Sequence, residues 1–321
     1  MNLTSGHVHG QPAPEQAVVF AVESDSLVGV LHHGEAQAHT GVLIVVGGPQ
    51  YRVGSHRQFL LLARRLAAAG VPVFRFDYRG MGDASGSARD FELVRDDISA
   101  AVDTFVQQVP TLRHIVIWGL CDAASAALDY AWRDARVSGL VLLNPWVRTE
   151  AGRARAYLRH YYLQRLTSRA FWSKLVRGGV NPLASLRSLT SFSAGLLRSR
   201  RSAQAPAALG PATSQRARID ATPLLPGQPL PERMAEGWRR FGGRILLILA
   251  GEDLTAAEFR DLVAASPVWQ ALLKQPGVSR CELAEANHTF ARQAWRTQVE
   301  DWTLEWLSQD DAAVGHDVSQ T

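Results

Sequence analysis

The sequence is poor in cysteine and has no long apolar run. Its 321 residues include only Cys121 and Cys281, too few for a disulfide framework. No segment approaches the roughly 20 apolar residues that a membrane-spanning helix needs, so we expect no transmembrane segment and leave only peripheral membrane contact open. The first residues lack the basic start and apolar core of a signal peptide. We therefore expect a cytoplasmic protein, because a reducing compartment keeps thiols free.

Basic charge is concentrated in one part of the chain. The net charge is only +4, yet residues 148–240 hold 17 Lys and Arg against 4 Asp and Glu. No nucleic-acid-binding module accompanies this charge, so we do not expect a nucleic acid as partner. We expect amphipathic helices in this segment, and arginines on helices of this kind usually form a solvated face. The alternative is that Arg159 and its neighbours, which alternate with tyrosines, guide an anionic substrate or contact an anionic lipid surface.

Buried strands alternate with helices in two parts of the chain. A hairpin around residues 23–25 comes first, and apolar runs then end near residues 48, 76, 119 and 143. This alternation predicts an α/β fold with a mostly parallel, doubly wound sheet. The pattern stops near Val147 and resumes with the strand RILLILAGE, a helix near 256–274, a last strand and a helix near 290–307. We predict a core of residues 1–146 and 241–308, a basic helical cap insertion of residues 147–240, and a flexible tail of residues 309–321.

The segment WGLCDAAS places a cysteine where a buried strand turns directly into a helix. Cys121 has Gly119 two residues before it and Ala123 two residues after it. This is the pattern of a nucleophile elbow, G-x-S-x-G, with cysteine for serine and alanine for the second glycine. A thiol at a helix N-terminus gains thiolate character, and a nearby imidazolium lowers its pKa further. The alternative is a cysteine that only packs beside the strand, because free cysteine is often buried.

Two further residues follow strands, in the chain order that is typical of the fold class with this turn. Asp253 comes at the end of the strand RILLILAGE, and His288 lies in the loop after the last strand. Glu252 is a rival for the acid, and either carboxylate could instead cap the following helix. Cys121, Asp253 and His288 occur in the order nucleophile, acid and histidine. They are the candidate catalytic residues.

The motifs together resemble the α/β-hydrolase superfamily over nearly the whole chain, with residues 147–240 in the place of its cap domain. The loop FDYRGMGDASG is similar to that of many serine-esterase and serine-aminopeptidase-like members. Within the superfamily, GGPQYRVGSHRQF, DYRGMGD, WGLCDAAS and GEDLTAAEF resemble the exosortase-A-associated hydrolase type 1 group, which is associated with bacterial exopolysaccharide and sorting gene clusters. The cysteine at the elbow also resembles dienelactone hydrolases and polyhydroxyalkanoate synthases.

The resemblance implies an oxyanion hole beside the cysteine. One donor is expected to be the backbone N–H of Asp122, directly after the nucleophile. The family's second donor falls on Pro49, which has no N–H, so this donor is expected to shift to Gln50 or Tyr51. The residues that we expect to bind substrate are Gly48, Arg52, His56 and Arg159.

The predicted reaction is hydrolysis of an ester, thioester or amide through a cysteine acyl-enzyme, with no cofactor and no metal ion. The expected substrate is a small-molecule or carrier-linked acyl compound. An acyltransferase is an alternative because a thioester intermediate reacts readily with alcohols and thiols, and a non-catalytic scaffold with the same fold is another. A dinucleotide site is disfavoured, because the spacing of Gly80, Gly82 and Gly86 is one residue too long for the fingerprint.

Overall fold

The computed structural model describes residues 14–48, 50–147 and 228–314. The chain divides into two units, of which the first comprises Met1–Val147 and Pro223–Thr321 and the second Arg148–Thr222. All described residues belong to the first unit. Most of the predicted insertion, including Arg159 and the arginines around it, lies outside the described residues.

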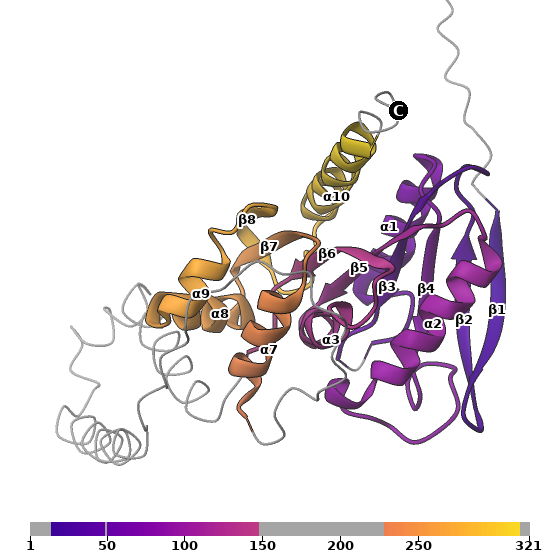
Figure 1. Cartoon of the computed structure of the whole chain (residues 1–321), viewed down its shortest axis with the longest axis horizontal. Coiled ribbons are helices and arrows are strands. Elements are labelled where there is room, and N and C mark those ends of the chain that lie inside the picture. Colours follow the sequence, from indigo (N-terminus) through magenta and orange to yellow (C-terminus); the bar gives the residue numbers. More distant parts are fainter. Residues whose placement is uncertain (1–13, 49, 148–227, 315–321) are drawn as a thin grey trace, which may run out of the picture. The chain divides into compact units, whose positions relative to one another are not determined.

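An eight-stranded sheet forms the centre of the described unit (Figure 1). Its strand order is β1-β2-β4-β3-β5-β6-β7-β8. The first two strands are antiparallel to each other, and β2 is antiparallel to β4, whereas all other neighbours are parallel. The predicted mostly parallel sheet is therefore confirmed. The strands are β1 (Glu15–Val22), β2 (Asp25–His32), β3 (Thr40–Val45), β4 (Val73–Asp77), β5 (His114–Leu120), β6 (Val137–Leu143), β7 (Arg244–Glu252) and β8 (Val278–Asn287).

The central strands are buried along nearly their whole length because helices cover both faces of the sheet. Every residue of β4 is buried, and so are all residues of β3 and β5 except the first of each. The strand register pairs Val45 of β3 with Gly119 of β5, and Gly119 with Leu142 of β6. The carboxyl ends of β3, β5 and β6 therefore lie at one edge of the sheet, and the loops that leave them meet there.

The helices pack in two groups of neighbours. Helix α1 (Gln58–Ala68) contacts α10 (Gln293–Val314), while α3 (Asp122–Ala131) contacts both α2 (Arg95–Gln108) and α7 (Leu230–Arg240). The expected helix near 256–274 is two helices, α8 (Leu254–Ala265) and α9 (Pro267–Leu272), because Ser266 caps α9 and Pro267 cannot continue the ladder of hydrogen bonds. The last helix also continues beyond its expected end near residue 307. Two short 3₁₀ turns, Ser55–Arg57 and Phe91–Leu93, precede α1 and α2.

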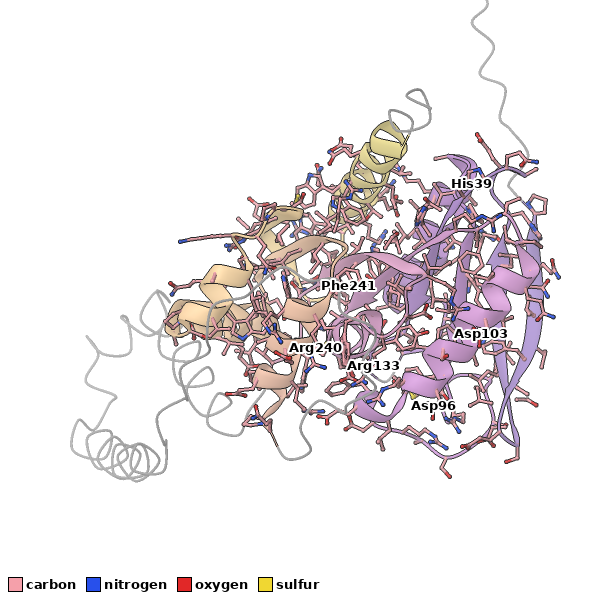
Figure 2. The ribbon with its side chains drawn as sticks, in the orientation of Figure 1. His39, Asp96, Asp103, Arg133, Arg240 and Phe241 are labelled. Atoms are coloured by element: carbon pink, nitrogen blue, oxygen red, sulfur yellow. The ribbon has the colours of Figure 1, made fainter. Side chains whose placement is uncertain are left out.

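Helix α7 packs closely on α3. Gly237 approaches the carbonyl oxygen of Leu128 so closely that a side chain would collide with it. The guanidinium carbons of Arg133 and Arg240 lie 4.0 and 4.6 Å from the ring centroid of Trp132. Figure 2 labels the two arginines. Such stacking of arginine on an indole is favourable. The helix that follows the undescribed segment is thus packed against the helix that follows the candidate nucleophile.

Candidate active site

The turn between β5 and α3 holds Cys121 in a strained backbone conformation. Its φ and ψ are 65° and −123°, a combination that is costly for a residue with a Cβ. Its N–H donates to the carbonyl of Leu143 at 2.8 Å, and its own carbonyl accepts from the N–H groups of Ala124 and Trp146 at 3.1 and 3.2 Å. These bonds to α3 and to the end of β6 hold the conformation of a nucleophile elbow in place.

Small residues around the elbow allow the chain to pass close to itself. A Cβ at Gly119 would lie 2.8 Å from the backbone carbonyl of Ala123. Ala123 is itself 1% exposed. At Gly47, in the loop after β3, a Cβ would collide with the carbonyl of Leu120 and the carboxylate of Asp122. The pattern thus contains small residues because larger side chains at these positions would collide with the neighbouring chain.

The structure brings Asp253 and His288 together. The Oδ1 atom of Asp253 lies 3.0 Å from Nδ1 of His288. The carboxylate of Asp253 is buried and also caps α8, accepting from the N–H groups of Thr255 and Ala256 at 3.3 and 3.0 Å. The rival, Glu252, is exposed. The carboxylate of Asp253 thus both caps α8 and lies beside the ring of His288.

The contact between the acid and the histidine is close but not aligned. Its length suits a hydrogen bond, yet the direction of the ring N–H of His288 does not, and Nδ1 has no hydrogen-bond acceptor in the described residues. Catalytic hydrogen bonds are often poorly aligned before substrate binds. The side chain of His288 is one-third exposed, so its ring can reach a substrate.

Asn144, which the sequence patterns did not single out, joins the loops of the candidate residues. It follows β6, is fully buried, and has a φ of 43°. Its Nδ2 donates to the carbonyl of His288 at 3.1 Å, and its Oδ1 accepts from the N–H of Ala250 at 2.8 Å. The signal in the sequence was an asparagine at the carboxyl end of a buried strand, a place where a polar side chain needs partners.

The loop after β3 is tied to the elbow by Asp122. The Oδ1 atom of this carboxylate accepts from the N–H of Gly48 at 2.7 Å. Burial raises the pKa of Asp122, and the hydrogen bond from Gly48 opposes that shift. The N–H of Gly48 is therefore already bonded. Beyond it, the side-chain oxygen of Gln50 accepts from the N–H of Ser55 at 3.1 Å, and Tyr51 is 47% exposed.

The DYRGMGD motif also helps to hold the loop after β3 in place. Asp77, at the end of β4, is fully buried and accepts from the backbone N–H groups of Arg52 and Asp83 at 2.6 and 3.1 Å. The guanidinium of Arg52 also pairs with the carboxylates of both aspartates. In addition, Arg75 donates to the carbonyl of Arg52 at 3.1 Å. The positive charge of Arg52 is thus balanced by the carboxylates of Asp77 and Asp83.

The second arginine of that motif is structural. Arg79 is fully buried, and its Nε lies 2.6 Å from Oδ1 of Asp97, which is also fully buried. Its Nη1 donates to Glu23 at 2.7 Å. This pair holds the glycine loop against α2 and the first hairpin. His56, which was expected to bind substrate, is exposed and has a φ of 54° in the turn before α1.

Within the described ranges, no group of three or more His, Cys, Asp or Glu residues could hold a metal ion. No helix there is long and apolar enough to cross a bilayer. Neither cysteine of the chain is in a disulfide.

Comparisons with known proteins agree with this architecture. The family model described as serine aminopeptidase, S33, matches residues 37–235, a span that includes the elbow but ends before Asp253 and His288. An esterase from Pyrococcus furiosus superposes with a TM-score of 0.59 at 13% identity, over 92% of this chain and 93% of that chain. A dienelactone hydrolase from Anabaena variabilis superposes with a TM-score of 0.55 at 16% identity, over 93% of this chain and 99% of that chain. The mouse α/β hydrolase domain-containing protein 10 superposes with a TM-score of 0.54 at 12% identity, over 92% of this chain and 99% of that chain. No curated protein matches in sequence.

Proposed function

Because the chain belongs to the serine aminopeptidase S33 family of α/β-hydrolases and is therefore a hydrolase, we propose that it cleaves an acyl bond with Cys121 as the nucleophile. His288 acts as the general base in this proposal, and Asp253 orients the histidine. The observation that carries it is the strained backbone of Cys121 at the β5–α3 turn. Strain of this kind is retained where it serves a purpose. The 3.0 Å approach of Asp253 to His288 supports the same assignment.

The proposed reaction has two halves. His288 removes the thiol proton of Cys121, and the thiolate attacks the carbonyl carbon of the substrate to form a tetrahedral oxyanion. The carbonyl then re-forms, the bond to the leaving group breaks, and His288 returns the proton to the leaving group. Water next attacks the thioester carbon and gives its proton to His288. The bond between the carbon and the sulfur then breaks, the carboxylic acid product leaves, and His288 returns its proton to the sulfur of Cys121.

The oxyanion needs donors beside the nucleophile. The N–H of Asp122 is the first, and it is assisted by its place in the first turn of α3. Gly48 is unsuited to be the second, because its N–H is bonded to the carboxylate of Asp122. We therefore keep the backbone of Gln50 as the second donor, with Tyr51 as the alternative.

The substrate is proposed to be a small-molecule or carrier-linked acyl compound, and an ester or thioester fits best with the esterase-like family. Acyl transfer to an alcohol or a thiol is the second candidate, because a cysteine nucleophile gives a thioester intermediate. The four segments that resemble the exosortase-A-associated group support a link to bacterial exopolysaccharide or sorting systems. The two cysteines outside any disulfide fit the cytoplasm.

A panel of p-nitrophenyl esters and acyl thioesters tests the proposal. We expect the wild-type protein to hydrolyse at least one of them, and Cys121→Ala and His288→Ala to lower kcat by about a thousandfold or more. Cys281→Ala is the matched control, since Cys281 lies on β8 away from the turn. Retention of activity in Cys121→Ala, or the same loss in Cys281→Ala, would contradict the assignment. Inactivity of the folded wild type on every substrate would favour the scaffold alternative.

A further inference from the structure

Helices α1 and α10 line a groove outside the proposed catalytic residues. Helix α1 begins at Gln58, directly after the loop that carries the expected oxyanion donors, and α10 begins at Gln293, shortly after the loop of His288. The two helices contact each other. Between them lies a groove of about 470 Å³, which is lined by Arg57, Leu61 and Arg65 on one side and by Gln293, Arg296, Thr297 and Glu300 of α10 on the other.

Two of the three arginines in this groove lack an acidic partner among the described residues. Arg65 pairs with Asp301 and lies 3.6 Å from Glu300. In the same ranges, no carboxylate forms an ion pair with Arg57 or Arg296, and Arg296 donates only to the carbonyl of Ala291. Burial raises the pKa of Glu300, and the charges of Arg65 and Arg296 oppose that shift, so Glu300 is the one acidic residue among the three arginines that line the groove. The groove therefore carries a net positive charge.

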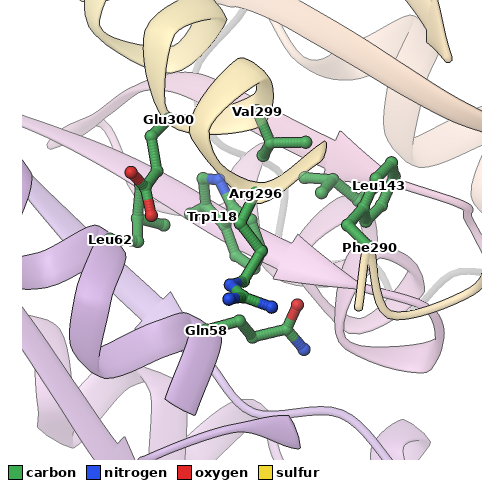
Figure 3. A pocket seen from close by; sticks show the side chains of 8 residues that line it. All are labelled: Gln58, Leu62, Trp118, Leu143, Phe290, Arg296, Val299 and Glu300. Atoms are coloured by element: carbon green, nitrogen blue, oxygen red, sulfur yellow. The ribbon is translucent and has the colours of Figure 1, made fainter. Parts of the chain in front are cut away.

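A narrower pocket adjoins the groove and shares Arg296 and Glu300 with it (Figure 3). Two of the side chains that line it, Gln58 and Trp118, are 7% and 2% exposed. The Nε2 of Gln58 and the Nε1 of Trp118 are buried donors without an acceptor in the described residues. Figure 3 shows the guanidinium group of Arg296 directed toward Gln58. Arg296 thus lines both the groove and this pocket.

We propose that this α1–α10 groove binds a phosphate group. Arg57 and Arg296, with Arg65 beside them, match a ligand with several acceptor oxygens and a double negative charge, because each guanidinium can donate two parallel hydrogen bonds to a phosphate. The inference goes beyond the acyl chemistry proposed above and does not depend on Cys121. The phosphate belongs either to the leaving group of the substrate or to free inorganic phosphate.

Binding of inorganic phosphate to the full chain tests the inference. Isothermal titration should give saturable binding that weakens as sodium chloride is added, because salt screens the charges. Arg57→Gln and Arg296→Gln should each weaken binding by about tenfold or more, the loss expected for one charged hydrogen-bond donor. Arg113→Gln is the matched control, since Arg113 is exposed at the amino end of β5. Arg57 is exposed and forms no ion pair in the described residues, so its replacement should leave the fold intact.

The same titration in Cys121→Ala separates this inference from the proposed function, because phosphate binding should persist when the nucleophile is absent. Competition identifies the source of the phosphate. If it belongs to the substrate, inorganic phosphate raises the KM of an acyl coenzyme A thioester but not that of p-nitrophenyl acetate; if free phosphate is the ligand, it affects both alike or neither. Binding that does not saturate, or that Arg57→Gln and Arg296→Gln leave unchanged, would overturn the inference.

Discussion

Asn144 donates a hydrogen bond from its side chain to the backbone carbonyl of His288, with 3.1 Å between Nδ2 and the oxygen. Its Oδ1 accepts from Ala250, three residues before Asp253. The residue before it, Leu143, accepts from the N–H of Cys121. The carboxyl end of β6 is therefore bonded to the nucleophile turn, to the strand that leads to the acid, and to the loop of the histidine.

Replacement of Asn144 should lower catalysis more than its effect on folding explains. Asn144→Ala leaves the N–H of Ala250 and the carbonyl of His288 without this partner, a loss of about 1–3 kcal/mol in the free energy of unfolding. We expect kcat to fall by at least about tenfold with little change in KM, because the bonds position the histidine and do not touch substrate. Steady-state kinetics over a range of pH, together with urea unfolding, measure the two effects.

Asn144→Gly supplies the control for that prediction. Glycine adopts a φ of 43° without strain, so this variant should unfold less readily than Asn144→Ala while losing a similar fraction of kcat. Activity that tracks stability in the two variants would show that Asn144 is only structural.

The carboxylate of Asp122 is expected to act through the loop that it holds. Asp122→Asn keeps an oxygen that can accept from the N–H of Gly48 and removes a charge whose burial is unfavourable. We expect this variant to stay within a few-fold of wild-type kcat. Asp122→Ala removes the acceptor, releases the loop after β3, and should lower kcat by about tenfold or more. Equal loss in both variants would contradict the positioning role.

Stability should fall in mild acid because His32 is buried as a neutral ring. Burial and the neighbouring Arg75 lower the pKa of His32 from 6.5 to about 4, and its Nε2 accepts a hydrogen bond from Arg75 at 2.8 Å. The unfolded chain thus binds a proton near pH 6.5 that the folded chain binds only near pH 4. Stability is complete above pH 6.5 and is lost as the pH falls toward 4, by up to about 3 kcal/mol.

Urea unfolding between pH 7.5 and 4 measures this loss. His32→Gln keeps an acceptor for Arg75 and should flatten the profile. His39→Gln is the control, since His39 is an exposed histidine (Figure 2). An unchanged slope in His32→Gln would assign the acid sensitivity to other groups.

The sequence patterns predicted a mostly parallel sheet because continuous apolar runs followed by helices are typical of parallel strands. They also located the Cys121 turn, Asp253 and His288, since each follows a strand. The roles of Arg52 and Asp77 could not be predicted. Whether such charges face a substrate or each other depends on which loops meet at the edge of the sheet. The order of the strands in space decides which loops lie side by side, and local sequence patterns do not encode that order.

Asn144 was missed for a related reason. Its partners, Ala250 and His288, lie more than a hundred residues further along the chain. No spacing rule connects a single asparagine with them. The double role of Asp253 was visible only in part, because the cap is a local feature of the sequence, whereas the approach to His288 is not.

The central claim is that Cys121 carries the acyl group, and intact-mass analysis followed by peptide mapping tests it most directly. After brief incubation with p-nitrophenyl acetate and an acid quench, the account predicts one acetyl group per chain, located on the peptide that contains Cys121. The adduct should be absent from Cys121→Ala and present in Cys281→Ala. An acetyl group that persists in folded Cys121→Ala, or that maps to another residue in the wild type, would contradict the account.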